Sequence, residues 1–214
     1  MKIVIPRQQM LGILRWSQRL LLAGAVSLFL YCGFVATDSW IFQRREHRRL
    51  EHLLTEHLLP GASQKHFPPS GEGSLIGRID IPRLQLSVMV AQGTGTTTLR
   101  RAAGHILGTA LPGEPGNIGV SGHRDTFFRP LRNIRENDII TMTTLKGEYR
   151  YRVVSTKIVA PSDVAVLAPS RKEILTLVTC YPFYFVGPAP SRFIVRAERT
   201  KLASTTIVPA RPRS

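Results

Sequence analysis

Short strand-like segments separated by turn signals run from Leu75 to Arg199, and they most constrain the fold of this 214-residue chain. Apolar and β-branched residues alternate within the segments, and Gly, Pro or Asn follows roughly every ten residues. About eight strands are indicated, among them 75–81, 86–90, 117–122, 138–143, 148–159, 174–180 and 192–199. Short helical segments are expected at 96–103, capped by Thr96 or Thr97, at 127–134 and at 164–167. Because closure removes exposed strand edges, the sequence predicts a mainly-β fold built on a closed eight-stranded barrel.

The N-terminal region contains an uncharged stretch from Leu20 to Thr37, which is long enough to cross a bilayer as a helix. Trp16 and Trp40 lie on either side of it, as aromatic residues do at membrane interfaces. Phe34-Val35-Ala36 is a poor signal peptidase site, so a retained anchor is favoured over a cleaved signal peptide. Cys32 lies inside this stretch and is interpreted as a lipid-facing or packing residue. Lys and Arg are nearly balanced on the two sides, so charge alone does not set the orientation.

We therefore expect five regions in chain order. They are a basic segment (1–19), a transmembrane anchor (20–37), a helical stalk and linker (38–72), a catalytic domain (73–200) and a basic disordered tail (201–214). His47, His52 and His57 recur every five residues, a spacing that spreads them around the stalk helix and predicts no metal site there. The net charge of +15 is spread along the chain. With no nucleic-acid motif present, that charge favours proximity to an anionic surface such as lipid headgroups or cell-wall polymer.

Cys180 is the only cysteine outside the apolar N-terminal stretch, and it ends a strand-like run that Tyr181-Pro182 stops. A lone free cysteine is often only a small buried hydrophobe, so a catalytic role requires partners. Acyl transfer by a thiolate needs a base or imidazolium, a proton donor for the leaving amine and a group that stabilises the oxyanion. His123 ends one predicted strand and Arg192 begins another. Strand ends that meet at one face of a barrel would bring the three residues together.

Other residues near these motifs have supporting or open roles. Thr179 is expected to shape the pocket and to support the cysteine backbone. Asp125 either orients His123 or Arg124, or caps the turn that leads to Phe127. His105 lies in a Gly/Pro-rich loop with no strand to aim it, so we expect a packing role there. No cluster of His, Cys and carboxylate residues has metal-ligand spacing, and no metal or other cofactor is expected.

Three motifs resemble those of one enzyme family, the sortases. Thr176-Leu177-Val178-Thr179-Cys180 resembles the sortase Thr-Leu-x-Thr-Cys signature, Ser121-Gly122-His123-Arg124-Asp125 resembles the histidine motif, and Arg192-Phe193-Ile194-Val195 resembles the arginine strand. The resemblance covers about residues 73–200 and keeps the family order of His, Cys and Arg. The residues that follow Cys180 and His123 are similar to the class D branch in particular.

This resemblance implies a single-pass membrane enzyme whose catalytic domain lies outside the cytoplasm. Such an enzyme cuts an exported protein after the threonine of a Leu-Pro-x-Thr-Gly sorting signal. Cys180 would form a thioester that an amine, commonly from a cell-wall peptide, resolves. His123 would protonate the leaving amine and deprotonate the incoming one, and Arg192 would hold the oxyanion. Some sortases use calcium, but the loops here show no dense acidic cluster, so that property is not carried over.

Three alternatives stay open at the level of the sequence. A cysteine peptidase would hydrolyse the thioester instead of transferring it. A peptidoglycan cross-linking transpeptidase usually has its cysteine in a Gly-Cys-x-Arg context, unlike Thr179-Cys180-Tyr181-Pro182. A non-catalytic, membrane-tethered module that binds anionic wall polymer fits the charge and the anchor, but it leaves the three motifs unexplained.

Overall fold

The structure is a computed structural model that describes residues 7–57, 71–185 and 187–200. It divides into two compact units, one reaching to Phe42 and one that starts at Gln43 and contains the barrel. The helices are α1 (Arg7–His57), α2 (Thr96–Arg101) and the 3-10 segments η1 (Pro82–Leu84), η2 (Arg129–Asn133) and η3 (Val164–Leu167). The strands are β1 (Leu75–Ile81), β2 (Leu86–Gln92), β3 (Ala103–His105), β4 (Asn117–Ser121), β5 (Ile139–Thr144), β6 (Gly147–Val159), β7 (Ile174–Tyr181) and β8 (Ser191–Arg199).

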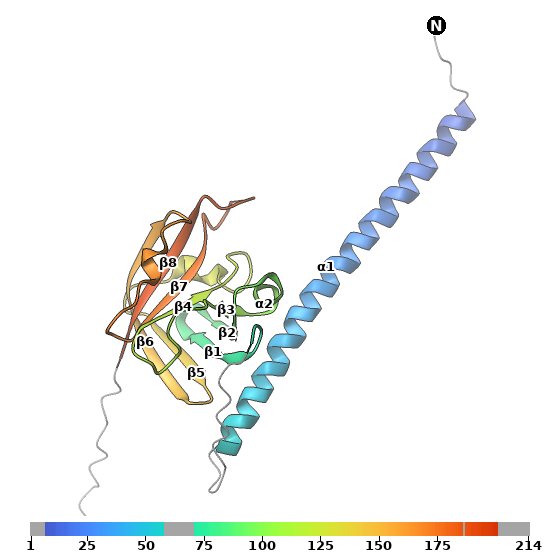
Figure 1. Ribbon diagram of the computed structural model, residues 1–214. Coiled ribbons are helices and arrows are strands. Elements are labelled where there is room, and N and C mark those ends of the chain that lie inside the picture. Colours follow the sequence, from blue (N-terminus) through green and yellow to red (C-terminus); the bar gives the residue numbers. More distant parts are fainter. Residues whose placement is uncertain (1–6, 58–70, 186, 201–214) are drawn as a thin grey trace, which may run out of the picture. The chain divides into compact units, whose positions relative to one another are not determined.

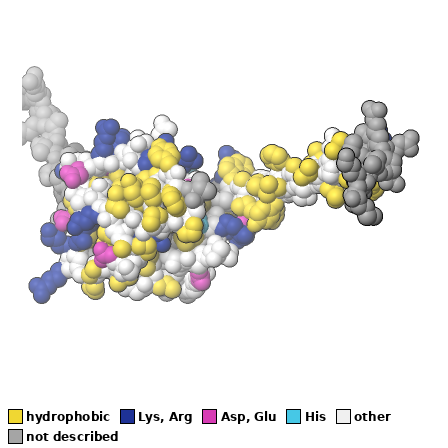
Figure 2. Space-filling view, turned by 90° about the horizontal axis from the view of Figure 1, so that it is seen from above, with side chains coloured by type: hydrophobic (Ala, Val, Ile, Leu, Met, Phe, Trp, Pro, Cys, Tyr) yellow, Lys and Arg dark blue, Asp and Glu magenta, His cyan; other side chains and the backbone are white. Residues whose placement is uncertain are grey.

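Helix α1 contains both the predicted anchor and the predicted stalk in one run of 51 residues. Its segment Gly12–Thr55 includes a window with a mean hydropathy of 2.1 whose side chains are not buried. Figure 2 shows hydrophobic side chains along this helix. Among the described residues this is the one helix that is long and apolar enough to cross a membrane, judged by length and composition. Most of the predicted linker and the whole predicted tail lie outside the described residues.

The eight strands close into a barrel in the order β1-β2-β3-β4-β7-β8-β6-β5, with β5 pairing back to β1 (Figure 1). This confirms the predicted closed eight-stranded barrel. All neighbouring strands are antiparallel except β2–β3 and β4–β7, which are parallel. Strand β7 lies between β4 and β8. Strand β4, which ends two residues before His123, therefore lies beside β7, which contains Cys180, and β7 lies beside β8, which contains Arg192.

The core forms because alternate residues of each strand point into the barrel. In β1, Ile79 and Ile81 are fully buried, whereas Arg78 and Asp80 between and beside them face outward and pair at 2.8 Å. Burying an aliphatic or aromatic side chain of this size stabilises the fold by about 1.5–3 kcal/mol. The largest fully buried side chains come from six of the strands, from η2 and the residue before it, and from α1: Tyr151, Phe128, Leu50, Ile79, Ile81, Met89, Ile118, Leu131, Ile140, Met142, Ile174 and Leu175.

Two local predictions were wrong. The sequence predicts a helix that reaches Ala103 and a Gly/Pro-rich loop around His105, but residues 103–105 form β3, which pairs with β2 on one side and β4 on the other. A three-residue strand is too short to leave a periodic signal, and only its two partners define it. Helix α2 begins after Gly95 with no side-chain cap bond, so the expected threonine cap is absent there.

Candidate active site

The pairing of β7 with β8 sets Cys180 directly opposite Arg192. Side chains of directly opposite residues in an antiparallel pair lie on the same face, with Cβ atoms about 4.5–5.5 Å apart. Both residues are half-buried, so both stay partly accessible to solvent. The structure thus brings together two of the three predicted catalytic residues.

The parallel pairing of β4 with β7 brings in His123. Ser121 is in register with Val178, and the Gly122 N–H donates to the Val178 carbonyl at 3.1 Å. His123 lies two residues beyond Ser121, as Cys180 lies two residues beyond Val178, so the histidine comes level with the cysteine on the neighbouring chain segment. His123 is exposed. The three residues therefore occupy adjacent positions at one end of the barrel, with Cys180 in the middle.

Thr179 joins the two segments just before these residues. Its hydroxyl donates to the Gly122 carbonyl at 2.7 Å, and the side chain is buried. A Cβ atom at Gly122 would come within 2.7 Å of the Phe128 ring, so no larger residue fits there without a shift. The residue before the cysteine is thus hydrogen-bonded to the residue before the histidine, which fixes the relative height of the two side chains.

The contacts of Asp125 do not support a role as the partner of His123. It is exposed, and its Oδ1 lies 3.4 Å from Nε of Arg124. Within the described part of the chain, the Asp125 carboxylate makes this contact with Arg124 and no other. Of the roles left open by the sequence, orientation of Arg124 is the one that has a contact to support it.

Arg124 is a residue that the sequence did not single out. Its side chain is buried, and its guanidinium donates to the carbonyls of Pro182 at 2.8 Å, of Phe185, and of Gly187 at 3.2 Å. These carbonyls belong to the loop between β7 and β8. Arg124 therefore fastens the loop that follows Cys180 to the segment that follows His123. The only signal in the sequence was a charged residue beside His123, which does not reveal burial.

Aromatic side chains and a second arginine hold the same loop. The rings of Phe183 and Phe193 lie 5.3 Å apart, and that of Tyr181 packs on both. Arg132 donates to the Tyr184 hydroxyl at 2.9 Å and lies over its ring. Aromatic contacts of this kind each contribute about 0.5–1.5 kcal/mol beyond simple burial. The loop leaving the cysteine is thus held on a fixed path.

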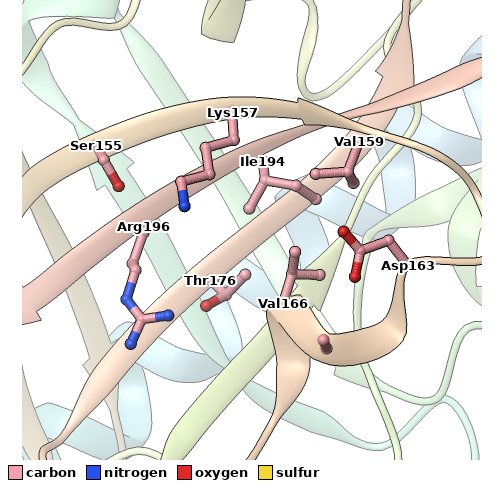
Figure 3. A pocket seen from close by; sticks show the side chains of 9 residues that line it. Ser155, Lys157, Val159, Asp163, Val166, Thr176, Ile194 and Arg196 are labelled. Carbon is pink, nitrogen blue, oxygen red and sulfur yellow. The ribbon is translucent and has the colours of Figure 1, made fainter.

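A pocket of about 250 Å³ opens on the same outward face of β7 and β8 (Figure 3). Its wall is the segment around η3, which Asn117 holds by donating from its amide to the carbonyls of Val166 at 3.0 Å and Ala168 at 3.2 Å. The hydroxyl of Thr176 donates to the Asn117 side-chain oxygen at 2.7 Å. The lining residues are Ser155, Lys157, Val159, Asp163, Ala165, Val166, Thr176, Ile194 and Arg196.

His105 lies in β3 and not in a loop, and it is almost completely buried. Its Nε2 is 2.9 Å from the Ala110 carbonyl, which can only accept, so Nε2 carries a proton. Its Nδ1 meets the side chain of Gln92 at 3.1 Å. Burial lowers the pKa of His105, and the hydrogen bond to Ala110 offsets part of that effect. These contacts are those of a structural histidine, in line with the packing role expected from the sequence.

The remaining sequence candidates lie elsewhere. Cys32 is exposed on α1. His47 and His52 also lie on α1, and in the described ranges no three His, Cys, Asp or Glu side chains come together as a metal site would require.

Comparison with known proteins gives a family. The sortase domain family matches residues 79–200, which is more than half of the chain. Sortase D of Bacillus subtilis strain 168 is 37% identical over 133 residues, which cover 62% of this chain and 66% of that protein. The chain thus spans just under two thirds of this relative's length.

Two solved structures have the same fold. A Clostridium perfringens sortase D5 transpeptidase superposes with a TM-score of 0.62 at 25% identity, covering 77% of this chain and 99% of that one. Clostridium perfringens sortase C with the C-terminal cell wall sorting motif gives 0.58 at 27% identity, covering 72% and 85%. Two of these three relatives carry the class D name, in agreement with the segments that follow His123 and Cys180. The chain belongs to the sortase family, whose members are cysteine transpeptidases.

Proposed function

We propose that this chain is a membrane-anchored cysteine transpeptidase that cleaves a Leu-Pro-x-Thr-type sorting signal of exported proteins and transfers the acyl group to an amine of the cell envelope. The observation that carries the proposal is the strand register, in which Cys180 is opposite Arg192 and level with His123. A thiol, a donor fork and an imidazole in one row are the groups that acyl transfer through a thioester needs.

In the proposed reaction, the Cys180 thiolate attacks the carbonyl carbon of the signal's threonine. The carbonyl oxygen becomes an oxyanion, which the guanidinium of Arg192 stabilises with directed N–H donors. The intermediate collapses to a thioester as the C–N bond breaks, and His123 gives its proton to the leaving amine. An incoming amine then attacks the thioester, His123 takes the proton from it, and Cys180 leaves as a thiolate.

Supporting roles follow from the contacts. Thr179 holds the cysteine and histidine segments at a common height through its bond to Gly122. Asp125 orients Arg124, which in turn holds the loop after the cysteine. The pocket beside η3 lies on the face that carries Cys180, and we assign it to the part of the signal that precedes the cut. A relative solved with a cell wall sorting motif supports a peptide substrate of this kind.

The membrane placement rests on α1, whose apolar segment has the length of a spanning helix. The predicted arrangement has a cytoplasmic N-terminus and a catalytic domain outside. Protease added to intact spheroplasts should then digest the barrel unit, and a domain that survives until the membrane is opened would refute this orientation.

The proposed chemistry is tested with the full-length chain in neutral detergent, a Leu-Pro-Ala-Thr-Gly peptide and an amine such as triglycine. The wild-type chain should form an acyl-enzyme, detected by mass spectrometry of the intact protein, and should produce the ligated peptide. Cys180→Ala should abolish both products, whereas the matched variant Cys32→Ala should retain them. Hydrolysis without ligation at saturating amine would favour the peptidase alternative, and no acylation at all would reject the proposal.

A further inference from the structure

We propose that Lys157 and Arg196 form a recognition site for an acidic side chain of the substrate, located immediately before the leucine of the sorting signal. The inference rests on the proposed function and extends it to a residue outside the signal itself. It names a class of substrate: exported proteins with Asp or Glu at that position.

The register of three strands gives the layout of this face. Strand β8 pairs with β7 on one side and β6 on the other, so residues line up in three rows across the strands. The first row is Val159, Arg192 and Cys180; the second is Lys157, Ile194 and Val178; the third is Ser155, Arg196 and Thr176. The reacting groups thus occupy the first row, and the pocket extends from it into the second and third.

The chemistry of the pocket changes from row to row. Near the reacting end it is apolar, with Val159, Ile194 and the η3 residue Val166. Lys157 extends from the same row as Ile194 and Arg196 from the next row, and Figure 3 shows both cationic ends on one side of the pocket. Lys157 and Arg196 are diagonal neighbours on adjacent strands, and such pairs have separations of about 7–8 Å. One carboxylate can therefore contact both.

The carboxylates nearest to Lys157 and Arg196 are either paired with another residue or on the opposite side of the pocket. Asp163 lines the pocket from the opposite side, beyond Ile194 and Val166 in Figure 3. Glu198 is the next outward residue after Arg196 on β8, and it pairs with Lys172 at 3.6 Å. Within the described residues the structure gives neither Lys157 nor Arg196 an ion-pair partner. Two neighbouring cations without a counter-charge repel each other, and a substrate carboxylate would relieve that repulsion.

The distance from Cys180 to Thr176 indicates which residue of the substrate reaches Arg196. Cys180 and Thr176 are four residues apart on one strand, a distance of roughly 13 Å at about 3.3 Å per residue. An extended substrate whose threonine carbonyl lies at Cys180 covers that distance in four residues, which brings the residue before the leucine to Arg196. The leucine and proline of the signal then lie over the apolar part of the pocket.

The size of the effect follows from exposure. Lys157 is exposed and Arg196 is half-buried, so solvent weakens the attraction but does not remove it. Arginine can bind a carboxylate with two parallel bonds, which adds directionality. We expect a three- to tenfold preference for glutamate over glutamine at this position, and a smaller preference at high salt.

The test uses the full-length chain in neutral detergent and four peptides. Three have Glu, Gln or Lys before Leu-Pro-Ala-Thr-Gly, and the fourth has Gln there and a Glu after the glycine. The rate of acyl-enzyme formation gives kcat/KM, and fluorescence anisotropy with the Cys180→Ala chain gives the Kd without chemistry. The variants are Arg196→Gln, Lys157→Gln and the double variant, with Lys146→Gln in the β5–β6 turn as a matched control for the loss of one positive charge.

The expected result is a Glu over Gln preference in kcat/KM and Kd that each single variant reduces, that the double variant removes and that Lys146→Gln leaves unchanged. A peptide with Glu before the leucine that is no better than its Gln counterpart would overturn the inference. So would a preference that survives the double variant, or one that appears only with Glu after the cut. If wild-type chain shows no acylation, the proposed function fails, while the Kd series still decides whether Lys157 and Arg196 select the acid.

Discussion

At the scale of single residues, the site depends on which donors surround Cys180. Arg192 is directly opposite the cysteine, and its Nη1 also donates to the carbonyls of Ser191 at 3.1 Å and Ala189 at 3.3 Å. These bonds hold one edge of the guanidinium against its own loop, and in the proposed reaction the other edge would face the substrate carbonyl. A planar group with five donors can serve both purposes at once, whereas an ammonium ion on a flexible chain cannot.

Replacing Arg192 with lysine should therefore keep the positive charge but remove the planar arrangement of N–H donors. We expect kcat/KM for peptide ligation to fall about 100-fold, as for removal of one oxyanion donor. Steady-state kinetics on the full-length chain measure this effect. Arg152→Lys, an exposed change elsewhere on β6, is the matched control and should stay within twofold of wild type. An Arg192→Lys chain with near wild-type kcat/KM would show that charge alone suffices.

At the scale of elements, side chains from other segments of the chain hold the β7–β8 loop in place. Arg124 supplies donors to three of its carbonyls, Arg132 contacts Tyr184, and Phe183 packs with Phe193 near the core. A loop has few internal hydrogen bonds, so side chains from neighbouring segments must satisfy its carbonyl groups. The strand ladder sets the backbone of Arg192, and its guanidinium also donates to the loop carbonyl of Ala189, so Arg124 helps to hold that guanidinium in place by holding the loop.

Arg124→Ala should loosen the loop and impair catalysis without unfolding the barrel. We expect kcat/KM to fall at least tenfold, because the loop carbonyls lose a buried partner, each worth about 1–3 kcal/mol when unsatisfied. Arg124→Lys should recover part of the rate, since an ammonium can satisfy some of the carbonyls. Limited proteolysis between β7 and β8 reports the loosening directly. Arg129→Ala, an exposed change in η2, is the control, and equal rates for the two alanine variants would contradict the role given to Arg124.

At the scale of the whole molecule, closure of the barrel buries a titratable group. His105 lies in the short strand that links β2 to β4, and burial lowers its pKa. The unfolded chain therefore binds a proton to this residue at a pH where the folded chain does not. The contribution of His105 to the free energy of unfolding is complete above its unfolded pKa of about 6.5, and it is lost as the pH falls through its folded pKa. Asp138, whose pKa is lowered mainly by Arg83, acts separately and only at lower pH.

Wild-type chain should thus lose thermal stability between pH 7 and pH 5, and His105→Gln should lose less. Glutamine keeps an N–H donor for Ala110 but does not titrate in this range. Melting temperatures of both chains, measured in the same detergent at pH 7, 6 and 5, give the comparison. Parallel curves for the two chains would mean that His105 does not contribute to the acid sensitivity.

Some features of the fold and of the candidate site could be predicted from the sequence, and others could not. The outward and inward alternation in segments such as 75–81 and 148–159 was readable, and so the closed barrel was predicted. Strand ends also identified Cys180, His123 and Arg192 as neighbours, which the register agrees with. Burial of Arg124 was not readable, because its three partners are carbonyls about sixty residues later in the chain. The three-residue β3 was missed because its pairing partners, not its own pattern, define it.

The sequence by itself determined the apolar helix, the β-barrel and the three motif residues, because each depends on local periodicity or on residue type. Only the tertiary structure decided which side chains share a face across β6, β7 and β8. That sharing depends on strand register, including the shift between Val153 and Ser155 that sets Lys157 beside Ile194. A shift of one residue would turn every side chain of β6 to the opposite face. The cationic end of the groove is therefore a product of register, which no single segment of the sequence contains.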